Sequence, residues 1–305
     1  MAAIELDGVT KRFGDLTAVN DLSLEVQEGE VYGFLGPNGA GKSTTINLVL
    51  DFIRPTEVSV RVLDRDAQEE SVAIRQRTGV LPEGFSVYDR LTGLQHVEFA
   101  IKSKESDDDP EAMLDRVGIL DAAERKAGGY SKGMRQRLAL AMALVGDPDL
   151  LILDEPSTGL DPNGAREMRE IVRDEADRGT TVFFSSHVLG QVEAVCDRVG
   201  ILRDGTLVAE DSIEGLRETT GADTTLRVET ASVPNGAIDE VSAVDGVSGV
   251  TQDDSVLYVD CDPSAKTSAI AALEGAGVDV TDFETEETSL EDIFVTYTEG
   301  EEVSA

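Results

Sequence analysis

Hydrophobic and polar positions follow two different rhythms near the start of the chain, and each rhythm predicts a different element. Apolar and polar residues alternate in Ile4–Val9 and Leu22–Val26, which predicts exposed strands. Val31–Leu35 is apolar throughout and runs into a glycine-rich loop, which predicts a buried strand. Thr44–Phe52 follows that loop as a predicted helix.

Strands and helices continue to alternate as far as about residue 212. Residues 91–146 are predicted to be mostly helical, with a polar interruption at Ser103–Pro110. Strand, helix and strand return over residues 150–187, and Asp204-Gly205 marks the turn of a hairpin. Alternation of this kind predicts an α/β fold, with a mainly parallel sheet covered on both faces. The N-terminal strands are predicted to form an antiparallel β subdomain at the edge of that sheet.

The pattern changes after about Gly221. Four short strands are predicted, with one helix at about Ser264–Ala276 between the last two; the strands are Thr224–Glu229, Val247–Thr251, Val256–Asp260 and Val278–Phe283. We therefore expect two domains, a large α/β domain at 1–220 and a small acidic α+β domain at 221–305. No catalytic group of residues is visible in the second domain.

Charge narrows the possible partners. The formal net charge is −35, and residues 206–305 alone hold 24 acidic and 3 basic residues. Such a surface repels nucleic acid and anionic lipid, because both need Lys or Arg to displace counterions. At about 1 M salt the screening length falls to roughly 3 Å, which removes most self-repulsion. The charge favours a salt-rich cytoplasm, as in a halophile; an ordinary acidic protein is the alternative.

The remaining composition fits a cytoplasmic chain. Only two cysteines occur, Cys196 and Cys261, and neither has a CxxC partner, so no disulfide framework or zinc site is predicted. The N-terminus has no apolar signal-peptide core. The longest uncharged apolar run, Leu138–Val145, is far shorter than the roughly 20 residues that span a bilayer.

A complete phosphate-loop pattern lies between the buried strand and the first helix. It consists of Gly36, Pro37, Asn38, Gly39, Ala40, Gly41, Lys42, Ser43 and Thr44. Glycines allow backbone N–H groups to converge on phosphates, and the helix start adds positive potential. We expect Lys42 to pair with the β- and γ-phosphates and the Ser43 hydroxyl to bind Mg²⁺. A fortuitous glycine turn is the alternative, and the strand–loop–helix context argues against it.

A second motif, of two acidic residues, ends the apolar run that begins at Leu150. The run Leu-Leu-Ile-Leu stops at Asp154 and Glu155. Asp154 is the candidate for the Mg²⁺ shell, and Glu155 is the candidate to polarise the attacking water. An acidic residue at the end of a strand is common, so the motif alone is weak evidence. It becomes strong evidence because the same chain also has a phosphate loop.

These residues, together with Tyr130-Ser131-Lys132-Gly133-Met134, resemble the ATP-binding subunits of ABC transporters. The five residues stand where that family keeps its signature motif, which caps the γ-phosphate held by the opposite subunit. The local pattern agrees, because Ser131 can cap a helix whose apolar residues form one stripe. The resemblance covers about residues 3–215 and implies a helical subdomain near 86–146.

Further positions match the family as well. Phe13 stands where an aromatic ring stacks on adenine, although a core phenylalanine is the alternative. Ser157–Asp161 resembles the loop that crosses between subunits, and His187 resembles the histidine that contacts the γ-phosphate. Asp161 is in addition a candidate helix N-cap, with Pro162 as the first helical residue and Gly179 beyond the end. His96 matches no motif and is predicted to be a surface helix residue.

The chain also departs from the family. Glu83 replaces the usual glutamine after an early strand, and a carboxylate there could still reach Mg²⁺. Asp51, Val58 and Asp64 stand where relatives often carry glycine, which indicates either acidic drift or altered turns. Lys132 and Met134 replace the commoner glycine and glutamine of the signature.

These variants, with Leu290-Glu-Asp-Ile-Phe near the end, look similar to the ATPases of type-2 exporters, a branch that drives multidrug or antibiotic export. The resemblance implies an ATPase whose two copies sandwich two Mg-ATP, with Ser131 and Gly133 of one copy facing Lys42 of the other. It also implies a separate membrane permease, docked near Glu83–Leu91, and a position on the cytoplasmic face of the membrane. The alternative is a soluble ABC ATPase of the iron–sulfur-assembly or DNA- or ribosome-acting kind. A phosphate-loop kinase or GTPase is disfavoured, because no Asn-Lys-x-Asp guanine-recognition element is present.

Overall fold

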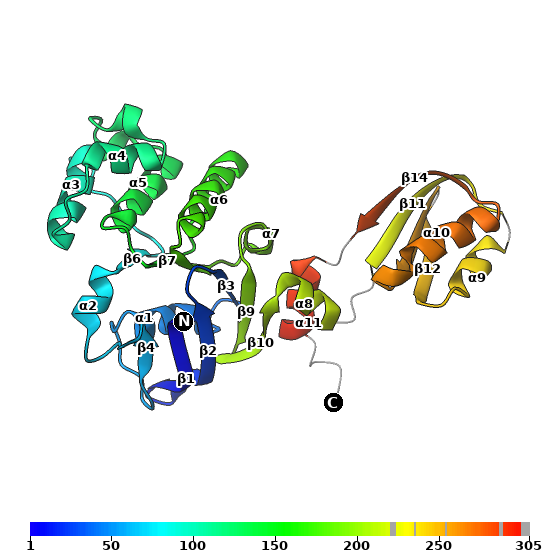
Figure 1. The fold of residues 1–305 in the computed structure, drawn as a ribbon, viewed down its shortest axis with the longest axis horizontal. Coiled ribbons are helices and arrows are strands. Elements are labelled where there is room, and N and C mark those ends of the chain that lie inside the picture. The colour runs from blue at the N-terminus through cyan, green and yellow to red at the C-terminus, as the bar shows by residue number, and fades with distance from the viewer. Residues whose placement is uncertain (220–223, 235, 254, 287–288, 300–305) are drawn as a thin grey trace. The chain divides into compact units, whose positions relative to one another are not determined.

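The computed structural model describes residues 1–219, 224–234, 236–253, 255–286 and 289–299 (Figure 1). The chain divides into two compact units. The first consists of Met1–Ile213 together with the end of the last helix from Tyr297, and the second consists of Glu214–Thr296.

The N-terminal strands form a sheet of their own. Its strands are β1 (Ala2–Phe13), β2 (Leu16–Gln27), β4 (Val60–Val62) and β5 (Arg65–Asp66), in the order β2-β1-β4-β5 with every pair antiparallel. Ile4 pairs with Val26 and Leu6 with Leu24, and all four side chains are buried. The predicted antiparallel β subdomain at the N-terminus is confirmed, and its strands expose polar residues such as Glu5 and Glu25 between the buried apolar ones. The prediction that these strands form the edge of the main sheet was wrong, because they belong to a separate sheet that β4 and β5 complete.

A six-stranded, mainly parallel sheet forms the centre of the first unit. Its order is β10-β9-β3-β8-β7-β6, and β10 is the antiparallel edge, joined to β9 by the predicted Asp204-Gly205 hairpin. The strands are β3 (Val31–Leu35), β6 (Thr78–Leu81), β7 (Leu150–Asp154), β8 (Thr181–Ser185), β9 (Arg198–Arg203) and β10 (Thr206–Ser212). Every residue of β3, β7 and β8 is buried, as expected for parallel strands covered on both faces.

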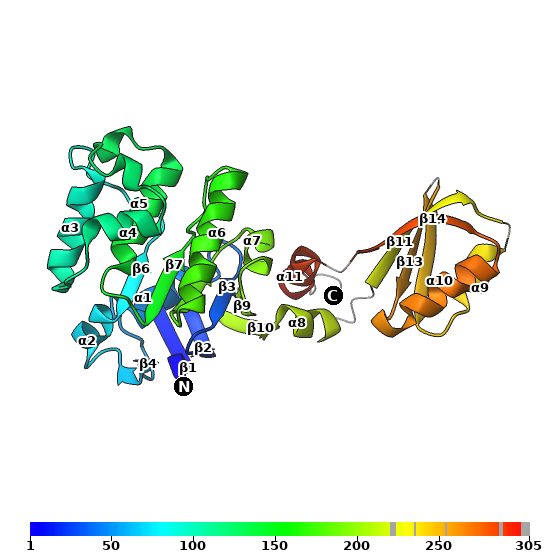
Figure 2. The same ribbon diagram turned by 45° about the horizontal axis from the view of Figure 1, so that its top comes forward.

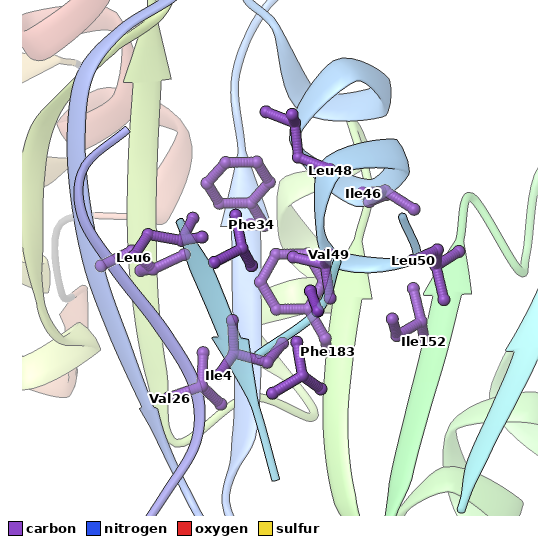
Figure 3. Close-up of a cluster of buried hydrophobic side chains, with 14 of the residues drawn as sticks. Ile4, Leu6, Val26, Phe34, Ile46, Leu48, Val49, Leu50, Ile152 and Phe183 are labelled. Atoms are coloured by element: carbon purple, nitrogen blue, oxygen red, sulfur yellow. The ribbon is translucent and has the colours of Figure 1, made fainter. Parts of the chain in front are cut away.

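One apolar core joins the two sheets. Helix α1 (Lys42–Val49) lies between them and contributes Ile46, Leu48 and Val49 to a cluster with Ile4 of β1 and Phe34 of β3 (Figure 3). This core fixes the start of α1, and with it the phosphate loop, to the end of β3.

Four of the six other helices of the first unit begin at a side-chain cap. They are α2 (Ser71–Gln76), α3 (Gly93–Lys104), α4 (Pro110–Arg116), α5 (Lys132–Leu144), α6 (Pro162–Asp177) and α7 (Leu189–Glu193). Thr92 forms a capping box with Gln95, Ser131 caps α5, and Asp161 caps α6 ahead of Pro162. Helices α3, α4 and α5 pack on one another in a separate group (Figures 1 and 2). Among the described residues, no helix is long and apolar enough to cross a membrane.

The second unit has the β-α-β-β-α-β order of a ferredoxin-like domain. Its antiparallel sheet has the order β12-β13-β11-β14, and α9 and α10 lie side by side against it (Figures 1 and 2). The strands are β11 (Thr224–Ser232), β12 (Val247–Asp253), β13 (Val256–Cys261) and β14 (Asp279–Glu286), and the helices are α9 (Ala237–Ser242) and α10 (Lys266–Gly275). The sequence patterns missed α9, together with α8 (Ile213–Thr219) and α11 (Leu290–Glu299).

Candidate nucleotide-binding site

A cavity of about 620 Å³ opens at the carboxyl ends of the parallel strands, where ligands bind in open α/β sheets. The loop after β3, Glu83 after β6, Asp154 at the end of β7 and His187 after β8 all line it. The predicted residues among its lining are Phe13, Pro37, Asn38, Gly39, Gly41, Lys42, Ser43, Thr44, Glu83, Asp154, Glu155 and His187. Gly36 and Ala40 belong to the same loop but are buried beneath it.

The phosphate loop needs its glycines for two physical reasons. Gly41 has a φ of 111°, and a Cβ there would lie 2.5 Å from the Ala18 carbonyl oxygen. A Cβ on Gly36 would lie 2.5 Å from the carbonyl oxygen of Leu202. The loop is therefore held so close to neighbouring backbone that it can present its own N–H groups to a ligand.

Lys42 is the cation at the centre of the cavity. It is buried, and its Nζ donates a 2.5 Å hydrogen bond to the carbonyl oxygen of Gly36. Burial lowers its pKa, while the negative charges of Glu155, Asp154 and Glu83 act in the opposite direction. The ammonium group is therefore surrounded by three carboxylates that it does not neutralise alone.

Asp154 provides the test of whether the site fits Mg²⁺. Its carboxylate is buried, and its pKa is raised by desolvation and by the nearby charges of Glu83 and Glu155. A divalent cation beside it would relieve that excess negative charge, and Ser43 supplies a hydroxyl oxygen in the same cavity. No group of three or more acidic, His or Cys side chains is arranged as a metal cage within the described residues. Oxygen donors without a full cage suit Mg²⁺, which keeps waters and substrate phosphates as ligands.

Glu155 is held in an unusual conformation by two neighbours. Its φ is 53°, in the left-handed region that non-glycine residues rarely adopt. Its Oε2 accepts hydrogen bonds from His187 Nδ1 at 2.7 Å and from Thr158 Oγ1 at 3.1 Å. The carboxylate is buried, whereas the His187 side chain is 55% exposed toward the cavity. The arrangement presents a fixed acceptor next to Lys42 and Asp154.

Phe13 lies at the mouth of the cavity and not in the core. Its ring is 47% exposed, and the Lys11 ammonium nitrogen lies 4.9 Å from the ring centroid. The alternative that Phe13 is a core phenylalanine is therefore wrong. An exposed ring with a cation beside it can serve as a stacking platform for a base.

Sequence reasoning missed part of the lining. Leu16, Thr17, Ala18, Asp204 and Gly205 also line the cavity. The first three follow Phe13 in the β1–β2 hairpin, so proximity in sequence could have found them. The Asp204-Gly205 turn could not be placed in advance, since only folding brings the Gly205 N–H within 2.9 Å of the Ala40 carbonyl oxygen.

The predicted signature residues lie on a different surface of the same chain. Ser131, Gly133 and Asp161 line a second cavity of about 430 Å³. The Ser131 hydroxyl accepts from the Met134 N–H at 3.2 Å, and the Asp161 carboxylate accepts from the Gly164 N–H at 2.8 Å. The two cavities share no lining residue, so one chain does not bring Ser131 to Lys42.

A third cavity, of about 710 Å³, lies beside the helical group and is mostly apolar. It is lined by Phe85, Ser86, Val87, Tyr88, Asp89, Arg90, Leu91, His96, Phe99 and Met142. His96 is only 2% exposed, so the prediction of a surface residue was wrong. Its Nε2 accepts from the Tyr88 N–H at 2.9 Å and its Nδ1 donates to the Thr92 carbonyl at 2.7 Å, which holds residues 88–92 in place.

Comparison with known proteins gives matches over both parts of the chain. The family described as "ABC transporter" matches residues 19–158, and the family described as "ATP-binding protein DrrA1-3-like, C-terminal domain" matches residues 212–298. The daunorubicin resistance ATP-binding protein DrrA3 of Streptomyces coeruleorubidus is 32% identical over 302 residues, covering 96% of this chain and 95% of that protein. The bacitracin transport ATP-binding protein BcrA of Enterococcus faecalis is 37% identical, covering 70% and 71%.

Solved structures show the same core fold. A structure described as the ATP-binding subunit of an ABC transporter superposes with a TM-score of 0.65 at 25% identity, covering 72% of this chain and 93% of the other. A dimeric ATP-binding cassette in a post-hydrolysis state with ADP and Pi superposes with a TM-score of 0.63 at 25% identity, covering 69% and 98%.

Proposed function

Because this chain belongs to the ABC transporter ATP-binding proteins, in the branch of the DrrA and BcrA subunits, we propose that it powers the export of an antibiotic or drug-like compound. The observation that carries the proposal is the near full-length similarity to DrrA3, which includes the C-terminal domain. The named relatives serve daunorubicin resistance and bacitracin transport. The compound itself is selected by a membrane subunit that this chain does not contain.

Lys42, Ser43 and Asp154 bind the phosphates and the metal in this proposal. Lys42 Nζ exchanges the Gly36 carbonyl for phosphate oxygens, which is favourable because the buried ammonium then meets a stronger charge. Ser43 and Asp154, with Glu83 just beyond the neighbouring strand β6, would hold Mg²⁺. When bound, Mg²⁺ neutralises charge that develops on the transferred phosphoryl group.

Glu155 acts as the general base in this proposal. It accepts the proton of the attacking water, and the hydrogen bond from His187 Nδ1 fixes the position of the carboxylate. His187 is exposed in the cavity, so its other ring nitrogen is free to face the γ-phosphate. Phe13 provides the platform on which adenine stacks.

A second copy of the chain completes the site. Ser131 and Gly133 lie at the start of α5, where helix N–H groups and the helix dipole favour an anion, yet they do not line the nucleotide cavity of their own chain. A head-to-tail pair would place this helix start over the phosphates held by the other copy. The similarity to a dimeric cassette supports this arrangement.

The apolar cavity beside the helical group is the proposed contact with the membrane subunit. Tyr88 and Phe99 are 70% and 62% exposed at its edge, which is unusual for side chains of this size. Glu83 lines the nucleotide cavity, and Phe85 lines the apolar one, so a single short loop connects both. The movement that closes the dimer would be transmitted to the membrane subunit through this loop. The ATPase would bind that subunit on the cytoplasmic face of the membrane.

The test compares the wild-type chain with Glu155→Gln. We expect the variant to bind ATP and to form an ATP-dependent dimer in light scattering, with phosphate release reduced at least a hundredfold. Exposed Glu124→Gln serves as the control and should hydrolyse ATP normally. Near-normal turnover in Glu155→Gln would remove the role given to Glu155. Failure of the chain to co-purify with a co-expressed membrane permease would argue against export.

A further inference from the structure

Thr158 touches the proposed base from the loop that follows it. Glu155, Pro156, Ser157 and Thr158 form a tight turn, in which the Thr158 N–H donates to the Glu155 carbonyl at 3.2 Å. In the same turn, Thr158 Oγ1 donates to Glu155 Oε2 at 3.1 Å. The turn therefore folds the side chain of Thr158 back onto the carboxylate that precedes it.

Two donors converge on one oxygen of this carboxylate. His187 Nδ1 and Thr158 Oγ1 both reach Glu155 Oε2, the first from the segment after β8 and the second from the loop directly after β7. Oε1 is the oxygen that neither donor engages, so it is the one available to a water molecule. A carboxylate held through a single oxygen by two donors has little freedom to rotate, which keeps Oε1 in a defined direction.

The backbone at Glu155 makes such restraint necessary. Its φ of 53° belongs to a sparsely populated region, and a residue stays there only when its surroundings hold it. The Glu155 N–H is bound to the Ser185 carbonyl at 2.9 Å, which anchors one side. The turn closed by Thr158 anchors the other side.

The rest of the loop is tied to α7. The Ser157 hydroxyl donates to the side-chain oxygen of Gln191, and Ser157 is buried. Thr158 and Gly159 are exposed, and Asp161 then caps α6. The side chain of Thr158 is thus the point at which the exposed part of the loop contacts the buried carboxylate.

We propose that Thr158 is a positioning residue for Glu155, whose hydroxyl fixes the direction of the carboxylate and makes its alignment depend on the position of the Ser157–Asp161 loop. This inference rests on the proposed function of Glu155 as the base. Since the loop lies beside Ser131 and Gly133 on the face that a second copy would cover, displacement of the loop would also misalign the base. Hydrolysis would then be slow in a chain whose loop is not held by its partner.

The test uses Thr158→Val, which keeps the shape of threonine and removes its hydroxyl. Hydrogen bonds to charged groups contribute enough for a loss of about tenfold in kcat when one is removed. We expect that loss with the KM for ATP changed less than about twofold, since Thr158 does not line the nucleotide cavity. Thr158→Ser retains a hydroxyl and should restore most of the rate.

The matched control is Thr219→Val on the exposed surface of α8. The Thr219 hydroxyl donates to a backbone carbonyl, that of Gly215 at 2.8 Å, and has no link to the cavity. Its kcat should equal that of the wild-type chain. Thermal melting of each variant shows whether the chain is folded, and Thr158 is exposed, so its replacement should leave the melting temperature nearly unchanged.

Three results would overturn the inference. These are a Thr158→Val variant with wild-type kcat, a Thr158→Ser variant as slow as Thr158→Val, or loss of the ATP-dependent dimer when Thr158→Val is added to Glu155→Gln. The last result would place Thr158 in the contact between copies and not behind the base. Fast turnover by Glu155→Gln alone would instead contradict the proposed function, whatever the Thr158 variants do.

Discussion

Arg116 and Glu175 form a two-pronged ion pair in the interior of the first unit. Arg116 Nε donates to Glu175 Oε1 at 2.7 Å, its second nitrogen reaches Oε2, and the Glu175 side chain is fully buried. Arg116 belongs to α4 of the helical group and Glu175 to α6, so the pair joins the helical group to the central sheet's helices. Arg178 provides a further contact to Glu175 from its exposed position.

Replacing Arg116 with Met should destabilise the chain strongly, because it leaves the Glu175 carboxylate buried with only one cation. Breaking a buried pair by removing one partner costs about 3–5 kcal/mol. Urea unfolding at constant salt measures the change. Arg173→Met breaks the half-exposed pair with Asp197 and should change stability by less than about 1 kcal/mol. Equal changes in the free energy of unfolding for the two variants would show that the buried pair stabilises the chain no more than the half-exposed pair does.

Asp154 should lower the stability of the chain when no cation is bound. Its pKa is raised in the folded state by burial and by Glu83 and Glu155, so the folded state holds the proton more tightly than the unfolded state. The destabilisation is therefore complete above the raised pKa, shrinks as the pH falls through it, and vanishes below the unfolded value of about 3.9.

The corresponding experiment is thermal melting of Asp154→Asn in EDTA from pH 8 down to pH 4. We expect a higher melting temperature than wild type at pH 8 and a smaller difference at pH 4. Asp121→Asn removes an equal charge from an exposed site and should show no such trend. Mg-ATP should raise the melting temperature of the wild-type chain and not that of Asp154→Asn. A melting temperature of Asp154→Asn below wild type at pH 8 would contradict the sign.

Val58 should be a point of backbone strain. Its φ is 66°, an outlier for a β-branched residue, and its side chain is 57% exposed, so little apolar burial compensates. The left-handed conformation costs an L-residue roughly 1–2 kcal/mol, which glycine would not pay. About half of that gain is lost, because glycine makes the unfolded chain more flexible and so more stable. Val58→Gly should therefore stabilise by about 0.5–1 kcal/mol in urea unfolding.

The control for Val58 is a valine of similar exposure in a helix. Val72 is 68% exposed in α2, and Val72→Gly should destabilise by roughly 0.5 kcal/mol through lower helix propensity. Opposite signs for the two substitutions would establish that backbone conformation, and not side-chain loss, decides the outcome. A destabilising Val58→Gly would contradict the strain.

The sequence predicted the elements that local chemistry specifies. The strand–loop–helix arrangement around Gly36–Gly41, the caps at Ser131 and Asp161, and the Asp204-Gly205 hairpin were confirmed, because each depends on residues within a few positions of one another. Asp51, Val58 and Asp64 have positive φ values of 51°, 66° and 62°, in the left-handed region that glycine adopts most readily.

What the sequence did not predict depends on contacts between distant segments. The alternation of β1 and β2 gave no indication that β4 and β5 complete a separate sheet with them. His96 matches no local motif, yet in the fold it is buried and its two ring nitrogens pair with the Tyr88 N–H and the Thr92 carbonyl. Helix α9 has only six residues, which is too short for a helical period to emerge.

The folded state should be stabilised by salt through screening alone. A net charge of −35 on 305 residues creates repulsion that the unfolded chain relieves by expanding. The screening length falls from about 10 Å at 0.1 M to about 3 Å at 1 M salt, so most of this repulsion disappears over that range. The urea midpoint should therefore rise steeply from 0.1 to 1 M KCl and more slowly above it. Sucrose stabilises by exclusion without screening, and it should raise the midpoint evenly with concentration. A midpoint that is the same in 0.1 M and 1 M KCl would contradict the proposal of a protein adapted to a salt-rich cytoplasm.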